Sequence, residues 1–278
     1  MRKVFILPSL ITSASMFCGL LAILNVLNVT EAGTEVENHR YVFSCWLILA
    51  AAVLDLLDGL VARLTRTESL FGAQLDSLAD VVAFGVAPAV LIYTRMSSMD
   101  NRHIAEGTAM FFAVCGALRL ARFNVQKSRV EKKSFTGLPI PAAAGMVVSS
   151  FLFFQRVDPE WDKKFILNFL PMMMVGLAFL MVSTISYPSF KQLQLERRKQ
   201  FEVLPIIFLL VALVVWNKDY LEAIVFFGFV IYVMGGVFGH ITRRWWHKSP
   251  PGHRVETAAS PVPDAGGADA KPAHSQDK

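Results

Sequence analysis

Charged residues are scarce in this sequence. They make up 18% of its 278 residues, whereas 54% are hydrophobic and the mean hydropathy is +0.46. The few charges cluster in short runs between long apolar stretches. A soluble domain is typically about 45–50% apolar. The composition therefore argues against a soluble globular protein and indicates a protein with several membrane spans.

Cysteine is also rare. Cys18, Cys45 and Cys115 all fall inside apolar segments and lack the spacing of metal ligands, so we interpret them as small buried hydrophobic residues. The net charge of +5 does not indicate a nucleic-acid partner, because the Lys and Arg residues flank apolar segments rather than one soluble face. These features exclude a disulfide framework, a zinc site and nucleic-acid binding from the prediction.

Apolar segments long enough to cross a bilayer recur along the chain. The first begins directly after Met1-Arg2-Lys3 and in this respect resembles a signal peptide. It is longer than a signal sequence and has no small-residue cleavage site, so we expect a retained helix. In lipid, such segments must be helices, because an open strand would leave backbone groups unpaired. The predicted fold is an all-α polytopic membrane helix bundle with about eight transmembrane helices, at 8–29, 41–62, 71–94, 105–124, 138–155, 165–187, 202–216 and 220–240.

The distribution of positive charge predicts the orientation. With a cytoplasmic N-terminus, 20 of the 27 Lys and Arg residues lie in or beside cytoplasmic connections. The positive-inside rule therefore places both termini in the cytoplasm. We expect a membrane domain over residues 1–248 and a disordered cytoplasmic tail over 249–278, since the tail is rich in Pro, Ala, Gly and Asp. The seven remaining basic residues would lie on the opposite side: Arg40, Arg95, Arg102, Arg156, Lys163, Lys164 and Lys218.

Four aspartates lie inside two consecutive spans. Asp55 and Asp58 share one face of the second predicted helix, and Asp76 and Asp80 share one face of the third. The connection between these helices is short, so we expect antiparallel neighbours whose four carboxylates converge near the cytoplasmic surface. Ionisable residues inside spans are costly and indicate function.

Clustered carboxylates need a compensating positive charge. Four such groups could not all stay ionised alone. Mg²⁺ or Mn²⁺ suits oxygen ligands without nearby His or Cys, and Ca²⁺ is an alternative. Salt bridges to Arg63 and Arg66, or a cation pathway through a transporter, are the competing interpretations. Small residues among the acids would admit a bulky ligand or allow tight helix packing, and their spacing alone does not decide: Gly59, Ala62 and Gly72.

The string D-x2-D-G-x2-A-R-x8-G-x3-D-x3-D, from Asp55 to Asp80, resembles the signature of the CDP-alcohol phosphotransferase family at every fixed position. The resemblance implies a six-helix core, often dimeric, with two metal ions and a CDP-linked substrate. It implies Asp55, Asp58 and Asp76 as metal ligands, with Asp80 as general base and further metal contact. It also implies a nucleotide and diphosphate site lined by Gly59, Ala62, Arg63 and Gly72.

Further segments are similar to the membrane-integral phosphatidylserine synthases of bacteria and archaea, a branch of this family. The resemblance spans about residues 5–240. It includes the N-terminal segment 7–19, in which Thr12 is a candidate substrate contact, although Ser9 and Ser15 stand where relatives often have Asn. The other matching segments read Asp76-Ser-Leu-Ala-Asp80-Val-Val-Ala-Phe-Gly85-Val-Ala-Pro88, Arg119-Leu-Ala-Arg122-Phe-Asn124, Thr136-Gly-Leu-Pro-Ile-Pro141 and Ser186-Tyr-Pro-Ser-Phe-Lys191.

This branch implies transfer of a phosphatidyl group from CDP-diacylglycerol to L-serine at the cytoplasmic membrane, with release of CMP. Arg119 and Arg122 are candidates for holding the serine carboxylate, with Asn124 as a polar neighbour, although anchoring at the membrane surface is the alternative for both arginines. A family member that uses glycerol phosphate, inositol phosphate or choline remains the nearest alternative. The basic loop of Lys127, Arg129, Lys132 and Lys133 is better suited to anionic lipids than to catalysis.

Overall fold

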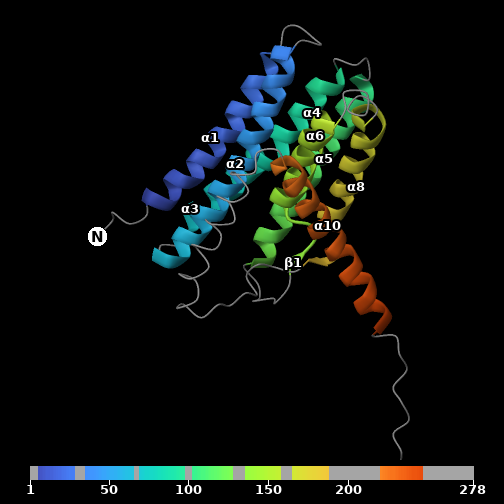
Figure 1. Cartoon of the computed structure of the whole chain (residues 1–278). Coiled ribbons are helices and arrows are strands. Elements are labelled where there is room, and N and C mark those ends of the chain that lie inside the picture. The colour runs from blue at the N-terminus through green and yellow to red at the C-terminus, as the bar shows by residue number, and fades with distance from the viewer. Residues whose placement is uncertain are drawn as a thin grey trace, which may run out of the picture.

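The helices of this chain lie side by side in one elongated bundle (Figure 1). The structure, a computed structural model, describes residues 6–28, 35–65, 69–97, 102–127, 135–157, 165–187 and 220–246. The predicted all-α architecture is confirmed. The one exception in the described ranges is a two-residue antiparallel pairing of β1 (Phe135–Thr136) with β2 (Ser186–Tyr187).

Among the described residues, seven continuous helical segments are long and apolar enough to span a membrane. The third and sixth each contain a π-helical stretch. In chain order, the elements are α1 (Ile6–Leu27), α2 (Glu35–Thr65), α3 (Leu70–Asp80) with η1 (Val81–Val86) and α4 (Ala87–Ser97), α5 (Arg102–Lys127), α6 (Ile140–Val157), η2 (Phe165–Phe169) with α8 (Leu170–Val182), and α10 (Leu221–Trp246).

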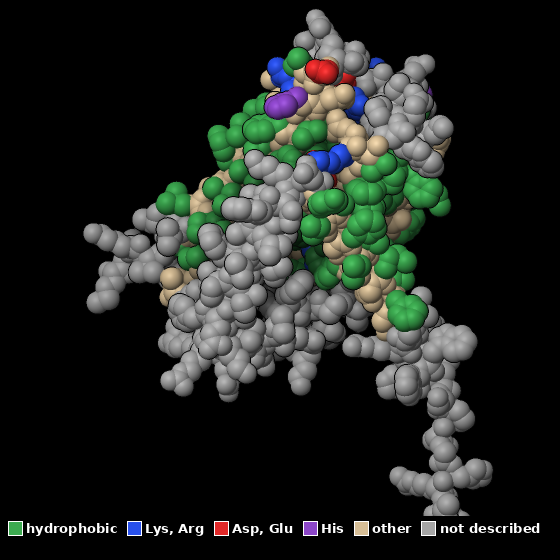
Figure 2. Space-filling model, in the orientation of Figure 1, with side chains coloured by type: hydrophobic (Ala, Val, Ile, Leu, Met, Phe, Trp, Pro, Cys, Tyr) green, Lys and Arg blue, Asp and Glu red, His purple; other side chains and the backbone are tan. Residues whose placement is uncertain are grey.

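The exterior fits a lipid environment. Hydrophobic side chains cover much of the described surface in Figure 2, while acidic, basic and His side chains gather towards its upper end. Leu56, Phe71 and Leu78 are each more than half exposed, although they are large and apolar. Together with the seven apolar helices, this surface identifies an integral membrane protein. The predicted span at 202–216 and the predicted tail at 249–278 lie outside the described residues.

Polar contacts along α1 and α2 fix these helices as an antiparallel pair. Near one end, the Thr12 hydroxyl donates to Asp58 Oδ2 at 2.6 Å. Ser15 donates to the Ala51 carbonyl at 3.0 Å. Towards the other end, Asn25 Nδ2 donates to the Arg40 carbonyl and to Ser44 Oγ, both at 2.9 Å. Because the contacts occur at several levels of the hairpin, α1 holds the acidic end of α2 in a fixed register.

Both π-helical stretches end two residues before a proline. η1 leads into Pro88, and η2 leads into Pro171. A proline has no N–H and its ring clashes with the carbonyl four residues earlier, so a wider turn relieves the conflict. At η1 the Ala87 N–H donates to the Val82 carbonyl, five residues back. The widened turn begins directly after Asp80. It therefore determines how α3, which carries Asp76 and Asp80, is oriented relative to α4.

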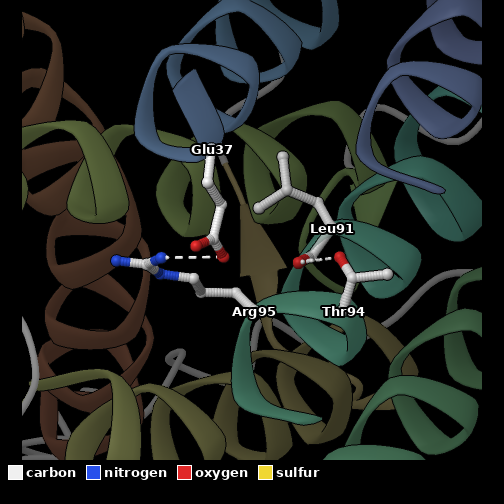
Figure 3. A network of polar contacts seen from close by, with 4 residues as sticks. All are labelled: Glu37, Leu91, Thr94 and Arg95. Carbon is white, nitrogen blue, oxygen red and sulfur yellow. Dashed lines mark hydrogen bonds and ion pairs between the residues drawn. The ribbon is translucent and has the colours of Figure 1, made fainter. Parts of the chain in front are cut away.

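A buried ion pair lies at the end of the bundle away from the aspartates. Arg95 Nη1 donates to Glu37 Oε1 at 3.2 Å, as Figure 3 shows, and the Arg95 guanidinium lies 5.2 Å from the Tyr41 ring centroid. The sequence placed Arg95 in a connection outside the membrane and began the second helix at residue 41. Instead, α4 continues to Ser97 and α2 begins at Glu35, so both charged residues are helical. Their mutual pairing makes burial possible.

Gly137 lies where the chain turns from β1 into α6. Its φ is +87°, in the region that favours glycine, and a Cβ there would collide with the carbonyl oxygen of Met181. The Gly137 N–H donates to the Ile185 carbonyl at 2.8 Å, so the turn also joins α6 to the segment after α8.

We expect Gly137→Ala to destabilise the protein by about 1–3 kcal/mol, because it adds backbone strain and a steric clash. The melting temperature in detergent should fall. Gly228→Ala is the matched control, since a Cβ at Gly228 meets no described atom within 4 Å and alanine is the better helix former. Equal melting temperatures for the two variants would contradict the role assigned to Gly137.

Candidate functional site: a carboxylate centre between α2 and the third span

Three of the four predicted aspartates meet in space. Asp55 from α2 and Asp76 and Asp80 from α3 each offer one carboxylate oxygen, and these three oxygens lie within 4.8 Å of one another. Asp55 contacts both of the other carboxyl groups. Carboxylates this close repel one another unless a proton or a cation lies between them. The cluster therefore has the donor set and spacing expected for a divalent cation held by oxygen ligands.

Asp58 lies one turn from Asp55, beside the cluster rather than in it. Its exposed fraction is 5%, as is that of Thr12, whose hydroxyl donates the 2.6 Å hydrogen bond described above. Asp58 still interacts electrostatically with Asp76. Thus α1, which carries no acidic residue in the site, fixes the orientation of one of the four carboxylates.

The third span approaches α2 differently from the sequence prediction. α3 packs mainly on α1, while the main contacts of this span with α2 come from η1 and α4. A Cβ at Gly19 of α1 would lie 2.7 Å from Ala83 Cα, so the absence of a side chain lets η1 rest directly on α1. The prediction that the two helices carrying the aspartates are direct neighbours is therefore only partly right, because α3 packs on α1 more than on α2.

A side chain at either glycine of the motif would meet no other helix among the described residues. A Cβ built at Gly59 has no described atom within 4 Å, and one at Gly72 meets only Ser69 Oγ, at 3.1 Å. By contrast, a Cβ at Gly116 would lie 2.6 Å from Ile140 Cδ1, and one at Gly145 would collide with Phe229. Helix packing therefore uses other glycines, and those beside the acids favour access for a ligand.

Two serines that hold α3 were not among the residues predicted from the sequence. Ser69 is its N-cap: Ser69 Oγ accepts the Gly72 N–H at 2.9 Å. Ser77 Oγ accepts a hydrogen bond from Asn124 Nδ2 at 2.9 Å and so joins α5 to the turn between Asp76 and Asp80. A serine directly before an apolar helical stretch is a recognisable capping signal. The partner of Ser77 is 47 residues away and has no comparable sequence signal.

The two candidate arginines of α5 have different surroundings. Arg122 donates to the carbonyl oxygens of Val182, at 2.8 Å, and Ser183, at 3.2 Å, so it caps the end of α8. Arg119 interacts electrostatically with Asp80, and its Nε is buried without a hydrogen-bond partner among the described residues. The side chain of Arg63 and all of Arg66 lie outside the described part of the chain. The salt-bridge alternative for these two arginines therefore stays a prediction.

Membrane-spanning helices and a cluster of intramembrane carboxylates define a polytopic membrane protein with a site suited to a divalent cation. The model of the CDP-alcohol phosphatidyltransferase family matches residues 5–186, and this chain belongs to that family. The match includes all four aspartates and six of the seven spanning helices. A chain of this family is a transferase, so the transporter interpretation loses its basis.

Several curated relatives carry the name CDP-diacylglycerol–serine O-phosphatidyltransferase, among them proteins of three distant microorganisms. The Helicobacter pylori protein is 39% identical over 196 residues, which cover 69% of this chain and 76% of the relative. The Methanocaldococcus jannaschii protein is 40% identical over 189 residues, or 68% and 77% of the two chains. The Bacillus subtilis protein is 35% identical over 187 residues, or 67% and 92%.

We expect Thr12→Val to weaken metal activation about 10- to 100-fold, the range seen when a partner of a metal ligand is lost. The change keeps the shape of the side chain but removes the hydroxyl that donates to Asp58. The measurement is the Mn²⁺ concentration that half-saturates CMP release. Ser13→Ala is the control, because Ser13 is on the same helix and donates only to the Ser9 carbonyl, at 2.7 Å. An unchanged Mn²⁺ requirement in Thr12→Val would contradict this role.

Proposed function

We propose that the protein transfers the phosphatidyl group of CDP-diacylglycerol to the hydroxyl of L-serine, forming phosphatidylserine and CMP. The observation that carries the proposal is the meeting of Asp55, Asp76 and Asp80 inside the membrane domain. It is supported by family membership and by the names of relatives that are 35–40% identical. Choosing serine over another acceptor rests on those relatives and on the basic residues of α5.

Asp80 is the proposed general base. In the forward reaction, the serine hydroxyl gives its proton to the Asp80 carboxylate as its oxygen bonds to the phosphorus that bears diacylglycerol. The bond from that phosphorus to the oxygen of CMP breaks, and CMP leaves as an anion. A serine hydroxyl is a weak nucleophile near neutral pH, so removal of its proton contributes substantially to the rate. Asp80 touches Asp55 and interacts with Arg119, so it is a member of the carboxylate cluster that also interacts with α5.

The proposed cofactor is Mg²⁺ or Mn²⁺, with two ions bound per chain. Its proposed ligands are the four aspartates Asp55, Asp58, Asp76 and Asp80. Bound metal would neutralise the diphosphate and stabilise the leaving CMP. Asp58 would act from beside the other three, with its orientation held by Thr12. The oxygen-only donor set and the close approach of three carboxylates support this assignment.

The remaining motif residues are assigned to the substrates. Gly59 and Gly72 leave the backbone accessible for the nucleotide and diphosphate, and Ala62, Arg63 and Thr12 complete the proposed lining. For the serine carboxylate, Arg119 is the stronger candidate because its buried Nε has no hydrogen-bond partner among the residues described. Arg122 already donates to the end of α8 and Asn124 to Ser77, so their proposed contribution is to shape the acceptor side.

Location follows from the substrate. CDP-diacylglycerol has its acyl chains in the bilayer and its nucleotide in water, so its reacting bond lies at the membrane interface. Asp55 and Asp58 are near the C-terminal end of α2, and Asp76 follows the start of α3 by two turns. We propose an enzyme of the cytoplasmic membrane, with both termini and the active site facing the cytoplasm and with a homodimer as the assembly.

The direct test uses purified protein, Mg²⁺ or Mn²⁺ and CDP-diacylglycerol, with CMP release measured for a panel of acceptors. L-Serine should give CMP and phosphatidylserine in equal amounts, while glycerol 3-phosphate, inositol phosphate and choline should not react. Release that does not depend on serine, or that occurs only with glycerol 3-phosphate, would refute the proposed acceptor. A reporter fused to the C-terminus tests the orientation, and activity on the outer side of the membrane would contradict it.

A further inference from the structure

The helix α10 lies beyond the family match, which ends at residue 186. It runs antiparallel to α6, as the 3.5 Å contact between Arg156 near the end of α6 and Glu222 near the start of α10 shows. It also contacts β2, at the other end of α6. In Figure 1 it crosses the bundle beside α6 and extends past β1. An element outside the matched segment therefore reaches the same end of the bundle as the aspartates.

One face of α10 is set towards the bundle. Phe229 occupies the space that the missing side chain of Gly145 leaves on α6. One turn further, Val233 is buried and Tyr232 packs partly buried against the core. The residues on either side, Ile231 and Met234, are 72% and 61% exposed. The contact at Gly145 thus fixes the rotation of α10 and turns Tyr232 inward.

The Tyr232 side chain interacts electrostatically with Arg119, and Arg119 in turn interacts with Asp80. Phe123 lies under the same guanidinium, at 6.0 Å from its ring centroid. The two other polar candidates of α5 have established partners, Arg122 on α8 and Asn124 on α3. Arg119 therefore interacts with Tyr232, Phe123 and Asp80, and no hydrogen bond to a described residue holds its buried Nε.

We propose that Tyr232 is a positioning residue for the acceptor: when the acceptor is bound, its hydroxyl hydrogen-bonds to the Arg119 guanidinium and holds it in the orientation that receives the serine carboxylate. The inference rests on the proposed function and extends it to a helix outside the matched family segment. A phenol hydroxyl can accept from a guanidinium and donate to a carboxylate, so it can serve both groups. Acceptor specificity would then depend on α10 as well as on the family motif.

The test is Tyr232→Phe in the full-length protein, purified in detergent, with both substrates varied. We expect the KM for L-serine to rise about tenfold, the size expected when a hydrogen bond to a charged group is lost. The kcat and the KM for CDP-diacylglycerol should stay within twofold, because the aspartates and the nucleotide side are untouched. Tyr220→Phe is the matched control, since Tyr220 precedes the same helix and is 67% exposed.

A second arm separates positioning from general structural support. Arg119→Lys should also raise the KM for serine, and adding Tyr232→Phe to it should raise that KM less than twofold further, since both residues act through one contact. The discrimination between L-serine and L-serinamide, which lacks the carboxylate, should shrink in Tyr232→Phe.

The role of Tyr232 would be overturned if its phenylalanine variant lowered kcat and melting temperature with the serine KM unchanged. Additive effects with Arg119→Lys would also overturn it. Failure of the proposed function gives a different result, because the wild type itself would then release no serine-dependent CMP. If the wild type uses another anionic acceptor instead, the same KM comparison with that acceptor still decides the role of Tyr232.

Discussion

Asp76→Asn should abolish measurable turnover, lowering CMP release by about 10³-fold or more. Asp76 is one of the three carboxylates whose oxygens lie within 4.8 Å of one another, and asparagine keeps the shape while removing the charge. Losing metal-based charge stabilisation removes several kcal/mol, and each 1.36 kcal/mol is a factor of ten in rate. The measurement is CMP release at saturating serine, together with Mn²⁺ binding followed by electron paramagnetic resonance.

The matched control is Glu106→Gln. Glu106 forms an exposed ion pair with Arg102 at 2.9 Å, in the first turns of α5 and away from the cluster. Such pairs contribute little to stability, so turnover and Mn²⁺ binding should stay within about twofold of the wild type. If Asp76→Asn retained full activity, the metal centre proposed for this site would be wrong. If it lost turnover but bound Mn²⁺ as tightly as the wild type, Asp76 would not be a ligand.

Asp80→Asn should lower kcat by about 10²–10⁴-fold, the contribution typical of a general base. The loss should be smaller than for Asp76→Asn, because loss of the metal would remove both substrate binding and charge stabilisation, whereas loss of the base removes only the proton transfer. The KM for CDP-diacylglycerol should change only a fewfold, since Asp55, Asp58 and Asp76 remain to hold the metal that would neutralise the diphosphate. Steady-state kinetics with each substrate varied, on protein of unchanged melting temperature, measure the effect.

Asp80→Glu provides the companion variant. It restores a carboxylate at a slightly different reach, so its kcat should lie between those of the wild type and Asp80→Asn. A wild-type kcat in Asp80→Asn would rule out the general-base role. Equal losses in Asp80→Asn and Asp80→Glu, with weakened Mn²⁺ binding in both, would instead assign Asp80 to metal binding alone.

Much of the fold could be predicted because lipid imposes a simple constraint. A span needs about 20 apolar residues and must be helical, so composition along the chain locates the helices without tertiary information. The structure describes helices in seven of the eight predicted positions. Their ends were less predictable: α2 begins at Glu35, since Glu37 finds a buried partner in Arg95, and no local signal indicates a partner 58 residues away.

The aspartates could be predicted as a group for a similar reason. Their spacing on two helices is local, and four acids inside spans are too costly to be incidental. The sequence could not predict that the four carboxylates have different neighbours. The structure puts Asp55, Asp76 and Asp80 in one cluster and turns Asp58 towards Thr12, because α1 packs on both acidic helices.

What the sequence by itself determined is the class of structure and the chemistry of its centre: apolar spans that must be helices, and a spaced set of aspartates matching a family motif. Only the tertiary structure decided what each neighbour of that centre does. Gly59 is open while Gly145 is packed, and Arg122 caps α8 while Arg119 interacts electrostatically with Asp80 and Tyr232. Local spacing fixes which face of a helix a residue is on, whereas its partner depends on which distant helix packs there.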